Sequence, residues 1–351
     1  MTALELSLRK QLILSAVVRH HINTGEPISS KALCELLDIG LSSATIRNEL
    51  FELCELGYLE QPHTSAGRIP TGKGYRTYVN HLMKPERVSS STKKAIDSLL
   101  DAISADPENF PSTAGEVLSN ITGLPVLLAT VPRDDAYVKR VELLPVSRRV
   151  MMLLMITSDG MARSRICRCG YDLTADTLML FDRIVSVNII GQSLTSLNAE
   201  FLKKLIIQAG ASGVAIISLL NTTFEMIEDI RRSTVKLRGK AALYDKYRSE
   251  AVARRLLDFI TRRDAVLSIM SSIDKPVDVV FGSDTEIDEL HDSGMVVARF
   301  KSGDNDLGRV GVFGPTRMSY EELIPSVHYF ADRLSAIMTQ ALRDMEDQNG
   351  N

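Results

Sequence analysis

The fold of the N-terminal region is decided by the stretch Ser42–Arg76, which has the sequence SSATIRNELFELCELGYLEQPHTSAGRIPTGKGYR. Its first part has helical periodicity, its middle predicts two short strands, and its end predicts another short helix. Between Gln61 and Lys84 the chain has four basic residues and no acidic one. A basic run beside an amphipathic helix indicates a surface that can contact a phosphate backbone.

The helix predicted from Ser42 to about Leu56 has one apolar and one polar face. A helical wheel places four residues on the core side: Ile46, Leu50, Leu53 and Cys54. Ser42 caps this helix, and its polar N-terminal half carries small or hydrogen-bonding side chains: Ser43, Ala44, Thr45, Arg47 and Asn48. Such a surface suits a major groove, because Arg and Asn pair with guanine and adenine edges. Glu52 and Glu55 should lie outside the groove. The alternative is an ordinary helix with a solvated face.

The flanking segments complete a winged helix-turn-helix pattern. Two helices are predicted before this one, at Leu4–Asn23 and from Ser29 or Ser30 to Leu37, followed by a tight turn with Gly40. Short strands at Tyr58–Gln61 and Arg68–Pro70 follow it, joined by turn residues. We expect the hairpin and the next helix to contact DNA through His63, Thr64, Ser65, Gly67, Arg68, Lys73 and Arg76. The alternative is that the hairpin is only a structural turn.

Two stretches resemble a known family. The first, residues 41–79, has the sequence LSSATIRNELFELCELGYLEQPHTSAGRIPTGKGYRTYV and is similar to the N-terminal signature of the HrcA heat-inducible transcription repressors. The second, Gly308–Leu323, has the sequence GRVGVFGPTRMSYEEL and resembles the closing motif of that family. The resemblance implies a homodimer that binds a double-stranded, inverted-repeat operator, the CIRCE element ahead of chaperone operons. It also implies a GroEL-type chaperonin as the partner that keeps the repressor active.

The chain is long enough for several domains, and we expect an α+β multidomain fold. Apolar or β-prone runs at Leu124–Val131, Val138–Pro145, Val150–Ile156 and Met161–Arg168 predict consecutive antiparallel strands. A mostly helical block and further strands after Pro276 follow. The resemblance implies that this layout is a GAF-like α/β domain interrupted by an inserted dimerisation domain. The expected boundaries are 1–104 (winged helix-turn-helix with linker), 105–195 and 275–343 (GAF-like), 196–274 (inserted domain) and 344–351 (polar tail).

Between Arg231 and Arg263 eleven basic residues stand against three acidic ones. This stretch could be a second nucleic-acid surface, but the apolar stripe of Val252, Leu256, Phe259 and Ile260 favours helices with a solvated basic face. No aromatic residues are interleaved in the way that a single-strand binder needs. Cys167 and Cys169 form an isolated pair, whereas a structural zinc site needs four ligands, so we expect no metal.

We expect neither an enzyme nor a cofactor, since none of the common catalytic or nucleotide-binding motifs occurs. Gly308–Gly314 only loosely suggests a phosphate-binding turn. With 44% hydrophobic and 24% charged residues, no spanning segment and no signal peptide, we expect a cytoplasmic protein that does not contact membranes. A second hypothesis is a metabolite-responsive winged-helix regulator that uses the GAF-like domain as ligand sensor.

Overall fold

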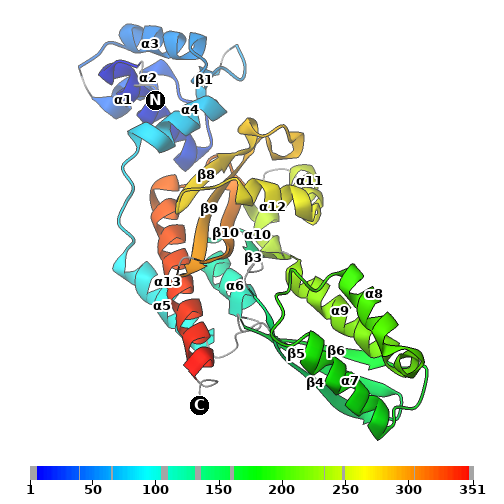
Figure 1. Cartoon of the computed structure of the whole chain (residues 1–351). Helices are drawn as coiled ribbons and strands as arrows, with labels where there is room; N and C mark the ends of the chain where they lie inside the picture. Colours follow the sequence, from blue (N-terminus) through cyan, green and yellow to red (C-terminus); the bar gives the residue numbers. More distant parts are fainter. Residues whose placement is uncertain are drawn as a thin grey trace.

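The computed structural model describes residues 6–38, 40–64, 66–103, 110–130, 136–158, 162–232, 234–246, 250–303 and 305–347. It shows a mixed α+β chain whose helical N-terminal region is followed by two larger β-sheets (Figure 1). We refer to three parts below: the winged-helix unit (residues 6–82), the sheet unit (90–130 and 234–347) and the inserted unit (136–232).

The winged-helix unit has the element order that the sequence predicts. Its elements are α1 (Leu8–Thr24), α2 (Ser30–Leu37), α3 (Ser43–Glu55), β1 (Leu59–Glu60), β2 (Ile69–Pro70), α4 (Gly72–Thr77) and the π-helix η1 (Tyr78–Leu82). The predicted caps are confirmed, since Ser29 and Ser42 each accept a hydrogen bond from a backbone N–H of the following helix. Gly25 ends α1 in the left-handed conformation that glycine favours.

The sheet unit is built on a five-stranded antiparallel sheet in the order β7-β3-β10-β9-β8. Its strands are β3 (Val126–Thr130), β7 (Thr234–Arg238), β8 (Val277–Phe281), β9 (Ser293–Ser302) and β10 (Asn305–Pro315). Its helices are α5 (Ser90–Ile103), α6 (Phe110–Thr122), α10 (Lys240–Lys246), α11 (Glu250–Thr261), α12 (Arg263–Ser271) and α13 (Tyr320–Asp347), with the 3-10 turns η3 (Gly282–Asp284) and η4 (Asp288–Leu290).

Both faces of this sheet are covered, as the apolar composition of its strands requires. Along β9, Val296 and Ala298 belong to the core under α13, while Met295 and Val297 belong to the core under α11 and α12. Successive side chains of a strand point to opposite faces, so one uniformly apolar strand serves both cores. The core under α13 also includes the buried residues of the winged-helix unit.

The inserted unit has its own three-stranded sheet and its own core. Its elements are β4 (Val138–Ser147), β5 (Val150–Thr157), β6 (Ala162–Arg168), α7 (Ala175–Asn188), α8 (Ala199–Ala209), the 3-10 turn η2 (Ala211–Ile216) and α9 (Ile217–Arg231). The buried residues of this core run from Ala136 to Ile230. Figure 1 shows the unit as a separate lobe beside the sheet unit.

This arrangement differs from the expected boundaries. The four predicted strands are present, but β3 pairs with β7 and β10, and only β4, β5 and β6 form one sheet. Residues 234–271 pack on the five-stranded sheet. We therefore place the interruption of the sheet unit at 136–232 and not at 196–274. The physical reason is that strand pairing is a long-range contact, which local periodicity does not determine.

Two local features of the sheet unit involve residues that disfavour or suggest particular turns. The helix α6 begins at Phe110. Pro111 is the second residue of α6, a position where a helix tolerates proline because the missing N–H has no intrahelical acceptor. Gly308–Gly314 lies within the strand β10 and forms no phosphate-binding turn. In the part of the chain that the structure describes, no helix has the length and apolar character to cross a membrane.

Candidate DNA-binding interface

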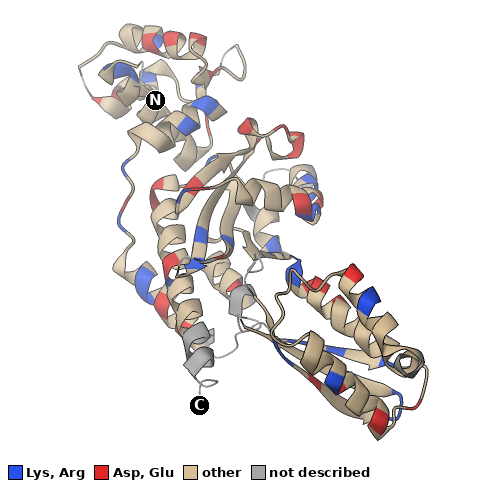
Figure 2. Cartoon of the chain, viewed as in Figure 1, with Lys and Arg blue, Asp and Glu red and all other residues tan. Residues whose placement is uncertain are grey.

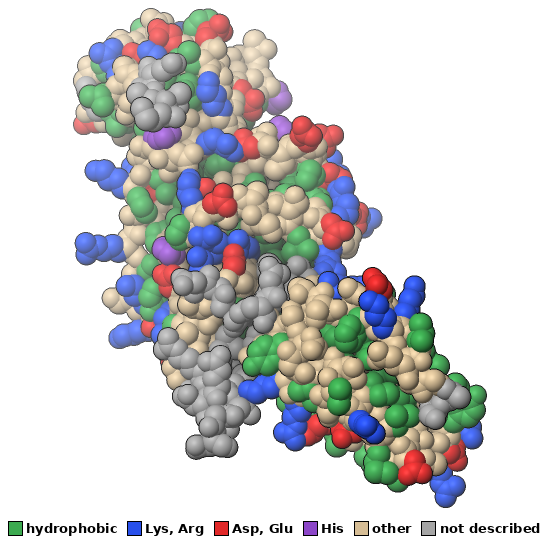
Figure 3. All heavy atoms as spheres, in the orientation of Figure 1, with side chains coloured by type: hydrophobic (Ala, Val, Ile, Leu, Met, Phe, Trp, Pro, Cys, Tyr) green, Lys and Arg blue, Asp and Glu red, His purple; other side chains and the backbone are tan. Residues whose placement is uncertain are grey.

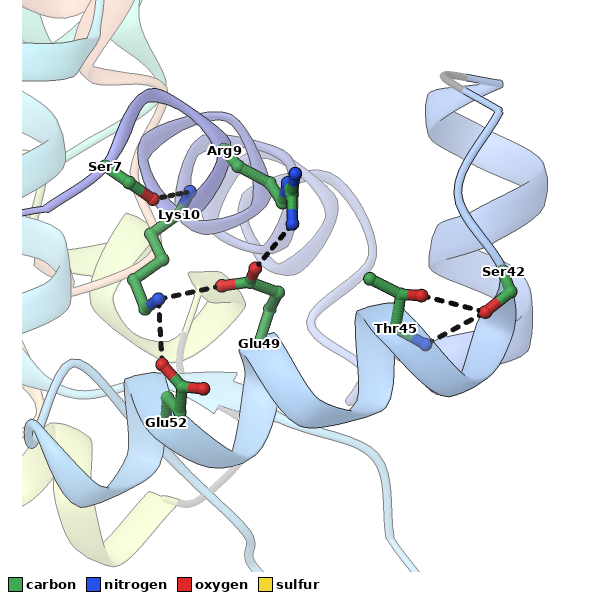
Figure 4. Close-up of polar contacts among 7 residues, drawn as sticks. All are labelled: Ser7, Arg9, Lys10, Ser42, Thr45, Glu49 and Glu52. Atoms are coloured by element: carbon green, nitrogen blue, oxygen red, sulfur yellow. Dashed lines mark hydrogen bonds and ion pairs between the residues drawn. The ribbon is translucent and has the colours of Figure 1, made fainter.

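The turn before α3 directs that helix across α2. Asp38 adopts a left-handed conformation with φ 45°, and Gly40 does the same with φ 69°. The Ser42 side chain then accepts from the Thr45 N–H at 3.1 Å, and the hydroxyls of the two residues are 2.9 Å apart (Figure 4). Ser42 and Thr45 therefore begin the helix and are engaged with each other before any DNA is present.

The two faces of α3 divide as the helical wheel predicts. Ile46, Leu50 and Leu53 are buried, and Cys54 is partly buried. Ala44, Arg47 and Asn48 are exposed together on the opposite side of the N-terminal half. Ser43 is partly buried, and its hydroxyl is 3.4 Å from that of Ser30 on α2. The exposed side chains available for base contacts are thus Ala44, Arg47 and Asn48.

Glu49 is a buried acid on α3 that the sequence reasoning missed. It is 9% exposed and forms ion pairs with Arg9 at 3.3 Å and Lys10 at 2.9 Å, both on α1. Lys10 also pairs with Glu52 at 2.8 Å (Figure 4). The hydrogen bond from Lys10 is the main cause that lowers the pKa of Glu49, and the bonds to Glu52 and Glu49 raise the pKa of Lys10. The carboxylates nearest the exposed half of α3 are therefore neutralised within the unit.

The ion pairs of Glu49 and Glu52 with α1 do not include Arg47. Among the residues that the structure describes, Arg47 has no ion-pair or hydrogen-bond partner, whereas Arg9 and Lys10 are both paired. A guanidinium that is exposed and unpaired is free to make the bidentate contact that this side chain forms with guanine.

The hairpin is held by its own backbone contacts. Ile28 and Arg68 exchange two backbone hydrogen bonds, at 3.1 and 2.9 Å, which join the hairpin to the connection between α1 and α2. A Cβ on Gly67 would lie 2.3 Å from the Ile28 carbonyl oxygen, so only glycine fits there. The Gln61 amide donates to the carbonyls of Thr64 and Ala66 at 2.8 and 3.0 Å, which orders the tip.

The predicted hairpin contacts therefore have different environments. His63 and Thr64 are exposed at the tip, whereas Gly67 and Arg68 are partly buried at its base. Ser65, also a predicted contact, lies outside the described residues. Gln61 was missed in the sequence because its role depends on the conformation of the tip and not on its position in a motif.

Lys73 and Arg76 have partners inside the protein. The Lys73 ammonium donates to the Leu56 carbonyl at 2.8 Å and lies 4.3 Å from the centre of the Tyr58 ring, so it caps the C-terminal end of α3. Arg76 forms an ion pair with Asp284 of the sheet unit. Phosphate contacts by these two residues stay a prediction and would require them to exchange partners.

The other candidate clusters show no site. Arg231, Arg238 and Arg262 of the basic stretch pair with acids, and the predicted apolar stripe of α11 packs on the sheet. Figure 2 shows basic and acidic residues interspersed over the part of the chain that is coloured by charge. Cys167 and Cys169 are buried with their sulfurs 4.0 Å apart. Over the described ranges, no three His, Cys, Asp or Glu side chains are grouped to hold a metal ion.

Three helices followed by a short hairpin, with the N-terminal half of the third helix exposed, have the arrangement of a winged helix-turn-helix, a fold class of transcription regulators. Residues 108–324 match the family model described as "HrcA protein C terminal domain". The chain therefore belongs to the HrcA family of heat-inducible transcription repressors. The members of this family are transcription repressors, in agreement with the expectation that the protein is not an enzyme.

Relatives of similar length support the assignment. The heat-inducible transcription repressor HrcA of Acetivibrio thermocellus is 28% identical over 331 residues, which cover 93% of this chain and 94% of the relative. The same repressor of Carboxydothermus hydrogenoformans is 30% identical over 337 residues, covering 94% and 97%. A crystal structure of a hypothetical protein at 2.2 Å resolution has the same fold, with a TM-score of 0.66, 24% identity and coverage of 96% and 99%.

Proposed function

We propose that the winged-helix unit places the N-terminal half of α3 in a major groove, with Arg47 and Asn48 nearest the base edges. The observation that carries this proposal is the unpaired, exposed Arg47 beside acids that Arg9 and Lys10 neutralise. His63 and Thr64 at the hairpin tip would follow the backbone or a minor groove. Phosphate contacts position such a unit, and base contacts supply its sequence preference.

The inserted unit supports the proposal of a homodimer. Of the seventeen large hydrophobic side chains that are exposed among the described residues, ten lie within it, including Met179, Val187 and Ile207. Figure 3 shows apolar side chains over its visible face. Leu180, Ile184 and Val187 of α7 line a cleft of about 390 Å³ together with residues of α8. Contiguous exposed apolar surface of this kind marks an interaction site, and a second copy of the chain is the occupant we propose.

A two-fold dimer binds an inverted repeat, because the symmetry of the protein is matched by that of the operator. The family resemblance implies that this operator is the CIRCE element ahead of chaperone operons and that the partner is a GroEL-type chaperonin in the cytoplasm. Heat would divert the chaperonin to unfolded proteins, lower the amount of active repressor and release chaperone genes. Binding of a partner to the active state alone would act by mass action.

Selection of bound DNA from a random pool tests the binding proposal. Recovery of an inverted repeat by the wild type, and its loss with Arg47→Ala, is the expected result. Recovery of random DNA with steep salt dependence would instead indicate an architectural binder. Light scattering tests the dimer, because Val187→Asp should give a monomer while Asp182→Asn on the same helix should not.

One observation favours the second hypothesis of a metabolite-responsive regulator. A cleft of about 600 Å³ lies between the linker before α5 and the start of α13, and Arg87 and Arg317 are among its lining residues. A thermal-shift screen with anionic metabolites tests it. Saturable stabilisation that Arg317→Ala abolishes would support a ligand, and the absence of any shift would reject this hypothesis.

A further inference from the structure

The closing motif lies where the winged-helix unit meets the sheet unit. It covers most of β10 and continues into the first turn of α13, where Glu321 is the second residue of the helix. Figure 1 shows the winged-helix unit above this end of α13. The DNA contacts proposed above do not involve this motif, so its role requires a separate explanation.

Glu321 joins α13 to three segments from the N-terminal part of the chain. Its carboxylate accepts from the Tyr78 hydroxyl at 2.6 Å and from the Arg19 guanidinium at 2.9 and 3.2 Å. Its backbone carbonyl accepts from the N–H of Glu86 in the linker at 3.0 Å. Burial, followed by the hydrogen bond to Glu321, raises the pKa of Tyr78 to about 12, so its hydroxyl stays protonated as a donor.

Other contacts also hold the two units together. The rings of Tyr75, Phe281 and Tyr320 pack with centroid distances of 5.6 to 6.4 Å. Arg76 pairs with Asp284 beside the Phe281 ring. The ring packing joins the two units through one apolar surface, and the hydrogen bonds of Glu321 to α1, η1 and the linker add directional contacts that define a rotation.

The linker itself does not fix the orientation. Residues 83–89 lie outside any helix or strand. Seven extended residues can span up to about 25 Å, which is several base-pair steps of about 3.4 Å. The distance between two DNA-binding units in a dimer therefore depends on how each unit is docked on its own sheet unit.

We propose that Glu321 is a positioning residue that sets the separation of the two DNA-binding units, and so selects operators by the spacing of their half-sites. The proposal rests on the dimer and inverted repeat of the proposed function. Glu321 contacts no DNA. It acts through Arg19 and Tyr78, which orient α3 relative to the sheet unit and hence relative to the partner copy. Half-sites on one face of the duplex must match this separation to within about one base pair, since each step also rotates the site.

The test uses the full-length protein and a series of operators whose spacer is shortened or lengthened one base pair at a time. Two variants disturb the same contact from opposite sides: Glu321→Gln removes the charge and keeps the shape, and Tyr78→Phe removes the hydroxyl and keeps the buried ring. Glu322→Gln is the matched control, because Glu322 is the exposed neighbour and its side chain lines the cleft beside the linker. Fluorescence anisotropy gives the affinity for each operator and for a single half-site.

We expect the wild type and Glu322→Gln to prefer one spacer, by a factor within the range of about 5–150 that is common for energetic coupling. If the coupling is lost, Glu321→Gln and Tyr78→Phe should keep the half-site affinity. Their affinities for operators whose spacers differ by one base pair should then lie within about threefold of each other. An unchanged spacer preference in both variants would refute the proposed role of Glu321 and leave the proposed dimeric function standing. A parallel loss at every spacer and at the half-site would show a merely structural role and also refute it. Absence of any spacer preference in the wild type would refute the dimeric function together with the proposal.

Discussion

Replacement of Glu49 by Gln should destabilise the winged-helix unit through loss of its ion pairs with α1. The Glu49 and Lys10 side chains are 12% and 17% exposed, so the pair lies between a surface pair, worth about 0–1 kcal/mol, and a buried one, whose disruption costs about 3–5 kcal/mol. Lys10 keeps Glu52, and Arg9 is half exposed, which lowers the cost. We expect a loss of about 2 kcal/mol, within the usual range for removing one partner of a buried polar contact.

Calorimetry of the full-length protein measures this loss. The cores of the winged-helix unit and one face of the sheet are continuous, so the cooperative unit is large, and about 2 kcal/mol corresponds to a decrease in Tm of about 4–8 °C. Glu52→Gln is the control; its side chain is 58% exposed, and we expect a loss of at most about 1 kcal/mol.

The pH dependence gives an independent check. The pKa of Glu49 is lowered in the folded state, so its contribution is fully present above the ordinary value of 4.5 and is lost as the pH falls through the folded value. The pKa of Lys10 is raised, so its contribution is lost only as the pH rises through a value above 10.5. The difference in Tm between wild type and Glu49→Gln should be constant from pH 5 to pH 8 and shrink below 4.5. A difference that is no larger than for Glu52→Gln, or that persists in acid, would refute the reasoning.

Substitutions at three further positions test the interface. Arg47→Ala should weaken operator binding by about 1–3 kcal/mol and relax base preference, while Arg47→Lys keeps the salt dependence and still loses preference; wild-type affinity and wild-type base preference in both variants would contradict the groove contact. Lys73→Met should lower the free energy of unfolding by about 1 kcal/mol, since its ammonium caps α3, and should lower the salt slope of binding by about one through loss of the predicted phosphate contact; an unchanged slope would refute that contact. Gly67→Ala should cost about 1–3 kcal/mol in a denaturant titration, because its Cβ would lie 2.3 Å from the Ile28 carbonyl oxygen, and wild-type stability would exclude that contact.

Much of the interface could be predicted because helix caps and amphipathic periods are local. The start of α3 at Ser42 and its buried face of Ile46, Leu50 and Leu53 follow from spacings of three and four residues. The family signature in the same stretch was equally local. Whether each polar side chain is available to contact DNA could not be predicted locally, because it depends on neighbours that are distant in the sequence.

Glu49 illustrates the limit, since its partner Arg9 is 40 residues away and lies on another helix. Lys73 and Arg76 have the composition of phosphate contacts, yet in the structure they contact Leu56 and Asp284. The sequence thus indicates which residues could contact DNA. Packing decides which of them have no partner inside the described part of the protein.

The sequence by itself determined the helical N-terminal unit, the family and nearly every strand of the larger sheets. Only the tertiary structure decided which strands share a sheet. Val126 pairs with Arg238 across the whole inserted unit, while β4, the next strand along the chain, joins β5 and β6. The physical reason is that a strand's apolar pattern specifies burial on its faces and leaves its edge partners open. Strand pairing closes long loops of the chain and is therefore decided by the tertiary structure. The same holds for Glu321, whose partners Arg19 and Tyr78 are more than 200 residues away in the sequence.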